Sequence, residues 1–337
     1  MVQKNDINMQ LIANKKIFIT GGAGYVGSAL LHKIMAQCFD CQITVYDSLL
    51  FNNGNTLFPF IGHPSELYNG NTFKFIKGDI RNPKLLGEAI KGHDVVIHLA
   101  ALVGYPLCRE KGQTESTSVN VLGTNNIIAL MSPDQYLLYG STGSNYGEVI
   151  GVCTEETPLN PLSIYGETKT SAERLVMDRP NSTAFRFATA FGVSPRLRLD
   201  LLINDLTYQV YTQKYANIFE PHFLRTFIHI KDMAEVFLFA INNFDKMKNN
   251  VYNVGSDSMN FSKKEICEII RTEMPFHVDF NYSGLGEDPD KRNYKVSYKK
   301  ISSLGYITHT TIQEGIKELI KSFSMVKISS PYHNNGF

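Results

Sequence analysis

The 337-residue sequence has no tryptophan and only five cysteines. The cysteines are scattered apart from Cys38 and Cys41, and that pair has no second pair and no nearby histidine to complete a zinc site. We therefore interpret both as structural thiols and expect no metal. The sequence also lacks any apolar run as long as a membrane span, and its first fourteen residues lack the apolar core of a signal peptide. These absences predict a cytoplasmic protein with no membrane partner.

An excess of either charge sign is also missing. Lysine and arginine number 33, aspartate and glutamate 32, and the net charge is +1. This balance argues against a nucleic-acid or membrane surface as the main partner. The hydrophobic content of 43% is ordinary for a globular protein, and the length allows one large domain or two.

Three glycines spaced three apart follow an apolar strand near the start of the chain, at Gly21, Gly24 and Gly27. Gly21 can take the positive φ of a tight strand-to-helix turn, and Gly24 lets the backbone approach a pyrophosphate. Gly27 lets the next helix, expected at 25–37, pack close to the strand. The free N–H groups of that helix would face the phosphates. The pattern predicts a dinucleotide-binding turn; the alternative is a tight turn without a ligand.

Asp47 supports the dinucleotide interpretation. It ends an expected strand at 42–46, where a carboxylate would accept hydrogen bonds from the adenosine ribose. No lysine or arginine lies between Ser48 and Thr56 to hold a 2′-phosphate. We therefore expect NAD rather than NADP, although a strand-end turn former would explain Asp47 by itself.

Short apolar runs alternate with helical patterns through most of the chain, which indicates parallel strands joined by crossover helices. Strands are expected at 16–20, 42–46, 72–76, 95–98, 135–138, 184–187 and 251–254. Helices are expected near 25–37, 83–91, 118–131, 164–177 and 231–243. The sequence thus predicts an α/β fold with a doubly wound parallel sheet of the Rossmann type.

The expected domains are not separated by one clean boundary. We expect an NAD-binding domain over 1–189, completed by about 227–273. The regular alternation is interrupted after Phe187, so 190–226 and 274–337 are expected to form a smaller, discontinuous substrate-binding lobe. The segment 51–71 is rich in Asn, Gly and Pro and is expected to make an irregular excursion over the adenosine end of the cofactor.

Tyr165 and Lys169 carry the strongest catalytic signal. Pro161 can open a helix, and positions i and i+4 of that helix lie on one face. A free tyrosine has a pKa of about 10 and is a poor base at neutral pH. A neighbouring ammonium and a positive nicotinamide both favour the phenolate, which would bring Tyr165 toward the working range. The alternative for this pair is a solvated helix face.

Two hydroxyl residues, Ser141 and Thr142, lie just past the carboxyl end of an expected strand. In an open parallel sheet this edge is where ligands bind. Thr142 could hydrogen-bond the reacting oxygen while Tyr165 takes its proton. Loop capping is the alternative for both hydroxyls.

Together these motifs resemble those of the extended short-chain dehydrogenase/reductase family, of the NAD-dependent epimerase/dehydratase type. The motifs are Gly21-x-x-Gly24-x-x-Gly27, Asp47, Gly78-Asp79-Ile80, His98-Leu99-Ala100-Ala101, the Ser141/Thr142 loop and Tyr165-x-x-x-Lys169. The resemblance covers nearly the whole chain and implies NAD as cofactor. It implies a cofactor site that includes Tyr25, Val26, Asp79, Ile80, Leu99, Ala100 and Ala101, and a catalytic set of Thr142, Tyr165 and Lys169.

Three later segments, 187–200, 225–229 and 286–292, resemble those of nucleotide-sugar enzymes. More closely, they are similar to GDP-heptose 4-dehydrogenases of bacterial capsule pathways. Arginines suit a diphosphate because their charge is permanent and their donors are forked. The resemblance implies a GDP-linked sugar as the favoured substrate, contacted by Thr142, Thr189, Arg196, Arg198, Arg225 and Arg292.

The chain departs from that resemblance at two places. Sugar-nucleotide 4,6-dehydratases of the family carry an Asp-Glu pair after the catalytic threonine, and here Gly143 and Ser144 occupy those positions, which argues against dehydration. Thr189 stands where many family members that bind UDP-sugars have Asn, so their substrate contacts do not transfer directly.

The sequence therefore predicts an oxidoreductase that passes a hydride from C4 of a nucleotide-linked sugar to NAD. A 4-epimerase begins with the same oxidation, and the sequence leaves the two outcomes open. A non-catalytic NAD-binding protein on the same fold is a third possibility, although Tyr165 and Lys169 are both present. The resemblance also implies a homodimer that pairs through the helices near 118–131 and 164–177.

Overall fold

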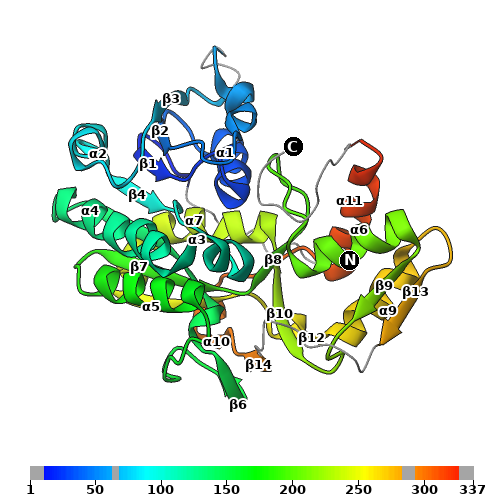
Figure 1. Cartoon of the computed structure of the whole chain (residues 1–337). Coiled ribbons are helices and arrows are strands. Elements are labelled where there is room, and N and C mark those ends of the chain that lie inside the picture. The colour runs from blue at the N-terminus through cyan, green and yellow to red at the C-terminus, as the bar shows by residue number, and fades with distance from the viewer. Residues whose placement is uncertain (1–10, 63–67, 283–292, 326–337) are drawn as a thin grey trace.

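A seven-stranded sheet forms the centre of the larger part of the molecule (Figure 1). The computed structural model describes residues 11–62, 68–282 and 293–325. The strand order is β11-β7-β5-β4-β1-β2-β3, and every neighbouring pair is parallel. The strands are β1 (Lys16–Thr20), β2 (Gln42–Asp47), β3 (Thr72–Lys77), β4 (Val95–His98), β5 (Tyr136–Thr142), β7 (Ser182–Phe187) and β11 (Asn250–Val254). This order confirms the predicted doubly wound α/β fold.

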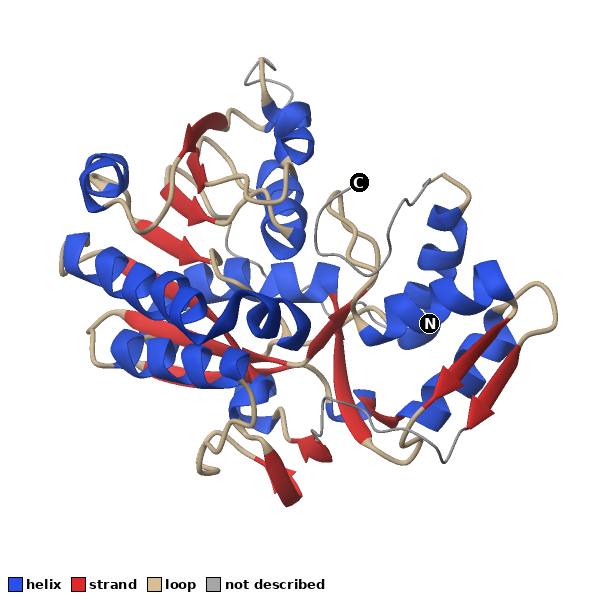
Figure 2. Cartoon of the chain, in the orientation of Figure 1, coloured by secondary structure: helices blue, strands red, loops and turns tan. Residues whose placement is uncertain are grey.

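Helices cover both faces of this sheet (Figure 2). The helices α1 (Tyr25–Gln37) and α7 (Ile230–Asn242) pack together on one face. On the other face lie α2 (Pro83–Ile90), α4 (Gly123–Leu130) and α5 (Ile164–Met177). Because both faces are covered, the central strands β1 and β4 are buried along almost their whole length. None of the described helices combines the length and the apolar character that a membrane span requires.

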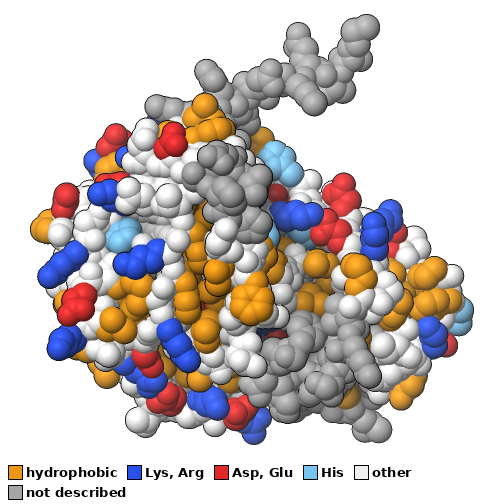
Figure 3. All heavy atoms as spheres, turned by 90° about the horizontal axis from the view of Figure 1, so that it is seen from above, with side chains coloured by type: hydrophobic (Ala, Val, Ile, Leu, Met, Phe, Trp, Pro, Cys, Tyr) orange, Lys and Arg blue, Asp and Glu red, His pale blue; other side chains and the backbone are white. Residues whose placement is uncertain are grey.

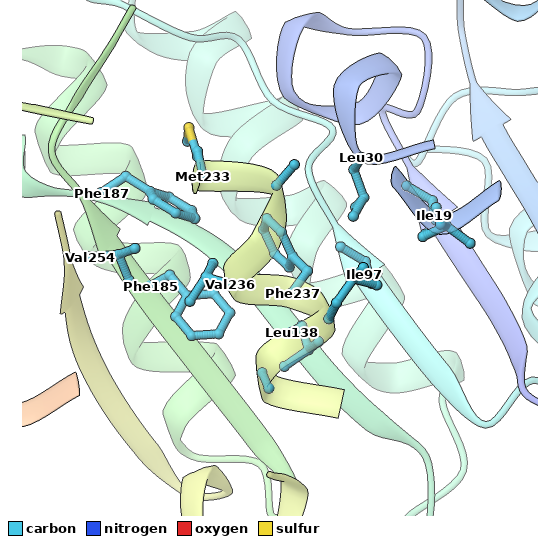
Figure 4. Close-up of a cluster of buried hydrophobic side chains, with 14 of the residues drawn as sticks. Ile19, Leu30, Ile97, Leu138, Phe185, Phe187, Met233, Val236, Phe237 and Val254 are labelled. Atoms are coloured by element: carbon cyan, nitrogen blue, oxygen red, sulfur yellow. The ribbon is translucent and has the colours of Figure 1, made fainter. Parts of the chain in front are cut away.

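The core beneath α7 shows how the layers are held together (Figure 4). Phe237 of α7 packs edge-on against Phe185 of β7, with ring centroids 5.4 Å apart. Ile97 and Leu138, from β4 and β5, belong to the same fully buried cluster. Burying a side chain of this size contributes roughly 1.5–3 kcal/mol, so this face of the sheet is a main source of stability.

A smaller part of the molecule has its own core. It contains α6 (Leu202–Gln213), α9 (Lys263–Glu273), α11 (Ile312–Phe323), and the parallel pair β9 (Tyr215–Ile218) and β13 (Asp279–Tyr282). A three-stranded sheet of β8 (Thr189–Phe191), β10 (Leu224–His229) and β12 (Asn260–Ser262) lies between this part and the large sheet (Figure 1). A separate pair joins β6 (Glu148–Cys153) to β14 (Asn293–Val296).

The packing differs from the expected domain boundaries in two places. Helix α9, expected to complete the first domain, buries Ile266, Cys267 and Ile270 in the second core. Conversely, the stretch from β14 through α10 (Lys299–Ser302), expected in the lobe, packs against the first core. The chain therefore crosses between the two cores more often than the alternation of the sequence indicated.

Two local predictions also need correction. The helix expected at 118–131 is the last part of a longer helical stretch, which begins with α3 (Tyr105–Thr117) and continues through the π-helical turn η3 (Ser118–Leu122) into α4. Sequence patterns do not reveal α3, because this helix is polar and is kinked at Gly112, whose φ is 79°. The excursion at 51–71 is not irregular throughout, because it contains the 3₁₀ helix η1 (Gly54–Phe60); residues 63–67 of that excursion lie outside the described residues.

Candidate active site

A cavity of about 370 Å³ lies at the carboxyl ends of the central strands. Most of the residues that the sequence singled out line it. They are Gly21, Gly24, Tyr25, Val26, Gly27, Asp47, Asp79, Ile80, Leu99, Ala100, Ala101, Thr142, Tyr165, Lys169, Thr189, Arg196 and Arg198. Residues as far apart in the sequence as Gly21 and Arg198 thus meet in one cavity, at the edge of the sheet where the sequence predicted a ligand.

The glycine turn forms one wall of the cavity. Gly21 has a φ of 73°, and a Cβ on it would lie 2.6 Å from the backbone nitrogen of Ala100. A Cβ on Gly27 would lie 2.4 Å from the carbonyl oxygen of Gly21. Both positions therefore need glycine for packing, and Gly21 also needs it for its backbone conformation. Among the described residues no side chain caps the first turn of α1, so its backbone N–H groups are available to an anion at the cavity wall.

Asp47 is fixed at the end of β2. Its carboxylate accepts hydrogen bonds from the backbone N–H groups of Ala23, at 3.0 Å, and Leu49, at 2.8 Å. Burial raises the pKa of Asp47, while these two N–H groups and the charge of Arg196 oppose the rise. Arg196 reaches this site from far along the chain, and its guanidinium lies over the ring of Phe51, 4.7 Å from the centroid. The sequence excluded basic residues only between 48 and 56, so this arginine was missed as a neighbour of Asp47.

The other predicted adenosine-side carboxylate, Asp79, is held by a neighbouring arginine. Arg81 pairs with Asp79 at 2.7 Å and with Glu115 of α3 at 2.9 Å. The hydrogen bonds from Arg81 lower the pKa of Asp79. Arg81 and Glu115 also line the cavity, and sequence reasoning missed both. Arg81 directly follows the Gly78-Asp79-Ile80 motif, which was the signal that could have found it.

These features fit a dinucleotide. The uncapped start of α1 offers donors for a pyrophosphate, and the Asp47 carboxylate is presented beside it for a ribose. The segment after β2 adds a cover, because Asn53 donates to the carbonyl of Ala23 in the turn and Leu50 and Phe51 line the cavity.

Helix α5 presents Tyr165 and Lys169 to the cavity. The helix begins at a defined place because the Ser163 hydroxyl accepts a hydrogen bond from the N–H of Gly166 at 3.1 Å. Lys169 is buried, and its ammonium lies 4.0 Å from the centroid of the Tyr139 ring. Burial lowers the pKa of Lys169 to about 7, against the opposing charge of Glu173. The cation expected from the sequence is therefore close to its deprotonation point at neutral pH.

The two hydroxyl residues at the end of β5, Ser141 and Thr142, have different partners. Thr142 ends the strand, and its hydroxyl oxygen accepts from the N–H of Ser144 at 3.1 Å. The Ser141 hydroxyl instead donates to the Glu173 carboxylate at 2.5 Å. Both residues line the cavity, but Ser141 is tied to α5. The hydroxyl of Thr142 is therefore the better placed of the two for a ligand.

The predicted substrate-side residues divide into three groups. Thr189, Arg196 and Arg198 line the cavity, and Arg198 pairs with Asp200 through bonds of 3.0 and 2.5 Å. Arg225 is buried, but it is not among the described residues that line the cavity. Arg292, with the rest of the segment 286–292, lies outside the described residues.

The face of the molecule drawn in Figure 3 does not favour one charge sign. Viewed from above Figure 1, side chains of both signs lie around the edge of the molecule, and hydrophobic side chains gather toward the middle (Figure 3). This mixture agrees with the balanced composition of the sequence.

Comparison with known proteins gives the chain a family. The model of the NAD dependent epimerase/dehydratase family matches residues 17–255. A relative named putative UDP-glucose 4-epimerase, from Methanocaldococcus jannaschii, is 28% identical over 317 residues, which cover 90% of this chain and 97% of the relative. The UDP-glucuronic acid decarboxylase 6 of Arabidopsis thaliana is 26% identical, with 93% of this chain and 90% of the relative covered.

Solved structures share the fold. A UDP-glucuronic acid 4-epimerase from Bacillus cereus superposes with a TM-score of 0.80 at 23% identity, covering 92% of this chain and 99% of that chain. A dTDP-glucose 4,6-dehydratase from Bacillus anthracis, solved with NAD, gives 0.77 at 24% identity, covering 92% and 97%. The arrangement of the central sheet and of the smaller part is thus common to all three chains.

Proposed function

This chain belongs to the NAD dependent epimerase/dehydratase family, and we propose that it oxidises the C4 hydroxyl of a nucleotide-linked sugar. Its cofactor is NAD, as the family and the fit of the cavity agree. The observation that supports the proposal most strongly is that these groups share one cavity. It is lined by the glycine turn, by the side chains of Thr142, Tyr165 and Lys169, and by Arg196 and Arg198. A dinucleotide, a reacting hydroxyl and a diphosphate would each find matching groups there.

The members of the catalytic set have different tasks. Tyr165 removes the proton of the sugar hydroxyl, and the Thr142 hydroxyl orients the same oxygen. Lys169 holds the nicotinamide ribose, and its charge favours the phenolate form of Tyr165. When bound, NAD accepts the hydride. The protein contributes position and electrostatics to a reaction whose redox chemistry belongs to the cofactor.

Elimination of water is not part of the proposed reaction. The two positions after Thr142 are Gly143 and Ser144, where 4,6-dehydratases that resemble this chain carry Asp and Glu. The carbonyl of Gly143 accepts a hydrogen bond from the Tyr294 hydroxyl at 2.8 Å, and Ser144 is buried. Gly143 has no side chain, and Ser144 offers a hydroxyl in place of a carboxyl group, so neither position supplies the acid and base pair that elimination uses.

The oxidised sugar has two possible fates. In the finer proposal, a GDP-linked heptose is oxidised and the 4-keto product is released, as the segments 187–200, 225–229 and 286–292 suggest by their resemblance. In the alternative, the hydride returns to the opposite face and the enzyme is a 4-epimerase, which the names of several relatives favour. Release of a keto product requires separate reoxidation of NADH, whereas epimerisation does not.

The test combines substrate choice with product analysis. Purified protein is incubated with matched panels of GDP-, UDP-, CDP- and dTDP-linked sugars, with and without added NAD, and products are identified by NMR. A stoichiometric 4-keto sugar with NADH supports the dehydrogenase, and a C4-inverted sugar without net NADH supports the epimerase. If none of the sugar nucleotides is oxidised or inverted at C4, the proposed function is wrong.

A further inference from the structure

A buried glutamate joins the helix that carries Tyr165 and Lys169 to the loop that carries Thr142. Glu173 lies four residues after Lys169, on the face of α5 that turns toward the sheet. Its carboxylate accepts hydrogen bonds from the Ser141 hydroxyl at 2.5 Å and from the Asn145 side-chain amide at 3.0 Å. Ser141 directly precedes Thr142, and Asn145 is the last residue of the short η4 turn (Gly143–Asn145) that follows Thr142. One carboxylate therefore fixes both ends of the loop against α5.

The same carboxylate is held from behind by an arginine of the sheet. Arg186 of β7 pairs with Glu173 through bonds of 2.7, 3.1 and 3.2 Å. The remaining donors of Arg186 reach the Tyr146 hydroxyl at 3.1 Å and the Glu155 carbonyl at 3.0 Å. Glu173 and Arg186 are both buried, so water cannot replace any of these bonds. The network leaves the Glu173 carboxylate little freedom to move.

Glu173 also faces the charge of Lys169. It is the main charge that opposes the effect of burial on this ammonium. The other polar groups around Lys169 are the thiol of Cys108 from α3, the ring of Tyr139 from β5 and the imidazole of His98 from β4, whose pKa is lowered by burial and by Lys169 itself. Among these neighbours, Glu173 is the carboxylate, and it is paired with Arg186.

We propose that Glu173 is a positioning residue for hydride transfer. It holds Thr142 and the η4 turn in place relative to Tyr165 and Lys169. The inference rests on the proposed function, because that proposal gives these three residues their tasks. The competing explanation is that the Glu173–Arg186 pair only stabilises the fold. A buried ion pair contributes little to stability compared with apolar residues of similar volume. Stability alone therefore does not explain why a charged pair occupies this place.

The principal variants cut the tie to the loop and leave the Glu173–Arg186 pair intact. Ser141→Ala removes one buried hydroxyl, and Asn145→Ala removes an amide that is not among the described cavity-lining groups. The matched control is Tyr136→Phe, because it removes a buried hydroxyl, bonded to Thr183 at 2.7 Å, from the opposite end of the same strand. Single-turnover NADH formation, substrate dissociation constants and melting curves are measured for each protein.

For Ser141→Ala and Asn145→Ala we expect hydride transfer at saturating substrate to slow by about 10- to 100-fold, since small displacements of reacting groups have effects of this size. Substrate affinity is expected to stay close to that of the parent. Tyr136→Phe is expected to lower the melting temperature and keep the parent rate. A folded Asn145→Ala protein that reacts at the parent rate would overturn the proposal, as would a Ser141→Ala effect confined to substrate affinity.

A second variant tests the charge and needs no turnover. Glu173→Gln removes the negative charge beside Lys169, so the ammonium loses its proton more readily and the phenolate of Tyr165 forms at higher pH. The readout is the ultraviolet phenolate absorbance during a pH titration, taken as the difference between each protein and its Tyr165→Phe counterpart. An unchanged titration in a folded Glu173→Gln protein would overturn the inference. If no sugar nucleotide is oxidised by the parent, the proposed function is wrong. The titration still decides whether Glu173 affects the protonation of Lys169 and Tyr165.

Discussion

At the scale of single residues, Lys169 combines a catalytic position with a cost in stability. Burial lowers its pKa in the folded protein to about 7, from 10.5 in the unfolded chain. Between about pH 7 and 10.5 the side chain of Lys169 is therefore protonated to a greater extent in the unfolded chain than in the folded protein. It follows that the contribution of Lys169 to stability becomes more favourable as pH rises from about 7 to 10.5.

We therefore predict that Lys169→Met makes the NAD-free protein more stable at pH 7, by roughly 2 to 4 kcal/mol. The gain should shrink as pH approaches 10, because the free-energy cost of losing that proton on folding falls as the pH nears the pKa of the unfolded chain. Chemical denaturation at several pH values measures this difference. The same variant should bind NAD more weakly, because the lysine is proposed to hold the nicotinamide ribose.

Lys263 provides the control for this experiment. It is also buried, but its ammonium donates to the carbonyl of Phe219 at 2.8 Å. Lys263→Met should therefore destabilise the protein by about 1 kcal/mol, through loss of that hydrogen bond. A Lys169→Met protein that is less stable than the parent at pH 7 would show that the ammonium is better compensated than its surroundings indicate.

Asp47 gives the second prediction at this scale, which concerns cofactor choice. Its two oxygens accept from the N–H groups of Ala23 and Leu49, so its orientation is fixed before a ligand arrives. A fixed carboxylate can accept from ribose hydroxyls and repels a 2′-phosphate. Asp47→Asn should weaken NAD binding by about tenfold and reduce the preference over NADP, because an amide can accept from only one of the two N–H groups and carries no charge.

Calorimetric titration with both dinucleotides checks this prediction, and extraction of the purified parent should yield NAD(H). A parent protein that carries NADP(H), or an Asp47→Asn protein with unchanged preference, would contradict the role given to Asp47.

At the scale of elements, the glycine turn can be tested by two equivalent backbone positions. Gly21 and Gly92 both have a φ of 73°, so an alanine is equally strained at either. They differ in surroundings, because a Cβ on Gly92 meets nothing within 4 Å, whereas one on Gly21 would lie 2.6 Å from the Ala100 nitrogen. The comparison separates backbone strain from crowding at the cavity.

We predict that Gly92→Ala costs about 1 kcal/mol and leaves NAD binding intact. Gly21→Ala should cost several times more and weaken NAD binding at least tenfold, because the turn must move away from Ala100. Thermal melts and NAD titration measure both effects. Equal losses in the two variants would mean that the turn tolerates a side chain and is not closely packed.

The elements that the sequence predicted well are those with a strong local signal. The strand β1 and the helices α1 and α5 have the expected bounds, because each has a local signal of its own. These signals are the apolar run of β1, the glycine spacing at the start of α1 and the Ser163 cap of α5. Helix α3 was missed because it is polar and kinked at Gly112. Helix α9 has a clear capping box at Ser262, yet its place in the second core depends on α6 and α11, which no local pattern specifies.

The same distinction applies to the site. Thr142, Tyr165 and the glycine turn follow strand ends and helix starts, and topology brings them together at one edge of the sheet. The approach of Arg196 to Asp47 and the tie from Glu173 to Ser141 arise from tertiary contacts over long separations. Such contacts depend on how loops pack, and a single sequence does not encode them in a readable pattern.

At the scale of the whole molecule, we propose a homodimer that pairs through the helical stretch 118–131 and α5. Leu122 lies in this stretch and is 56% exposed, although it is a large apolar side chain. Helices paired across a twofold axis would bury it against the partner. Light scattering at micromolar concentration should give twice the mass of one chain.

Leu122→Asp should shift this protein toward monomers, because the dimer would bury an unpaired charge. Ile150→Asp is the matched control, since Ile150 is a fully exposed apolar residue of β6, outside the proposed interface. A parent protein that is monomeric, or a dimer that Leu122→Asp leaves intact, would contradict this mode of pairing.

The central claim for the whole molecule is that one cavity brings a sugar hydroxyl, Tyr165 and NAD together for hydride transfer. Single-turnover formation of NADH with a saturating sugar nucleotide tests it most directly, in the parent, in Tyr165→Phe and in the control Tyr136→Phe. Removing the Tyr165 hydroxyl keeps the ring and should slow hydride transfer by about 10²- to 10⁴-fold, while folding and NAD binding persist. A folded Tyr165→Phe protein that transfers hydride within about threefold of the parent rate, far less than the loss of a positioned base, would contradict the account.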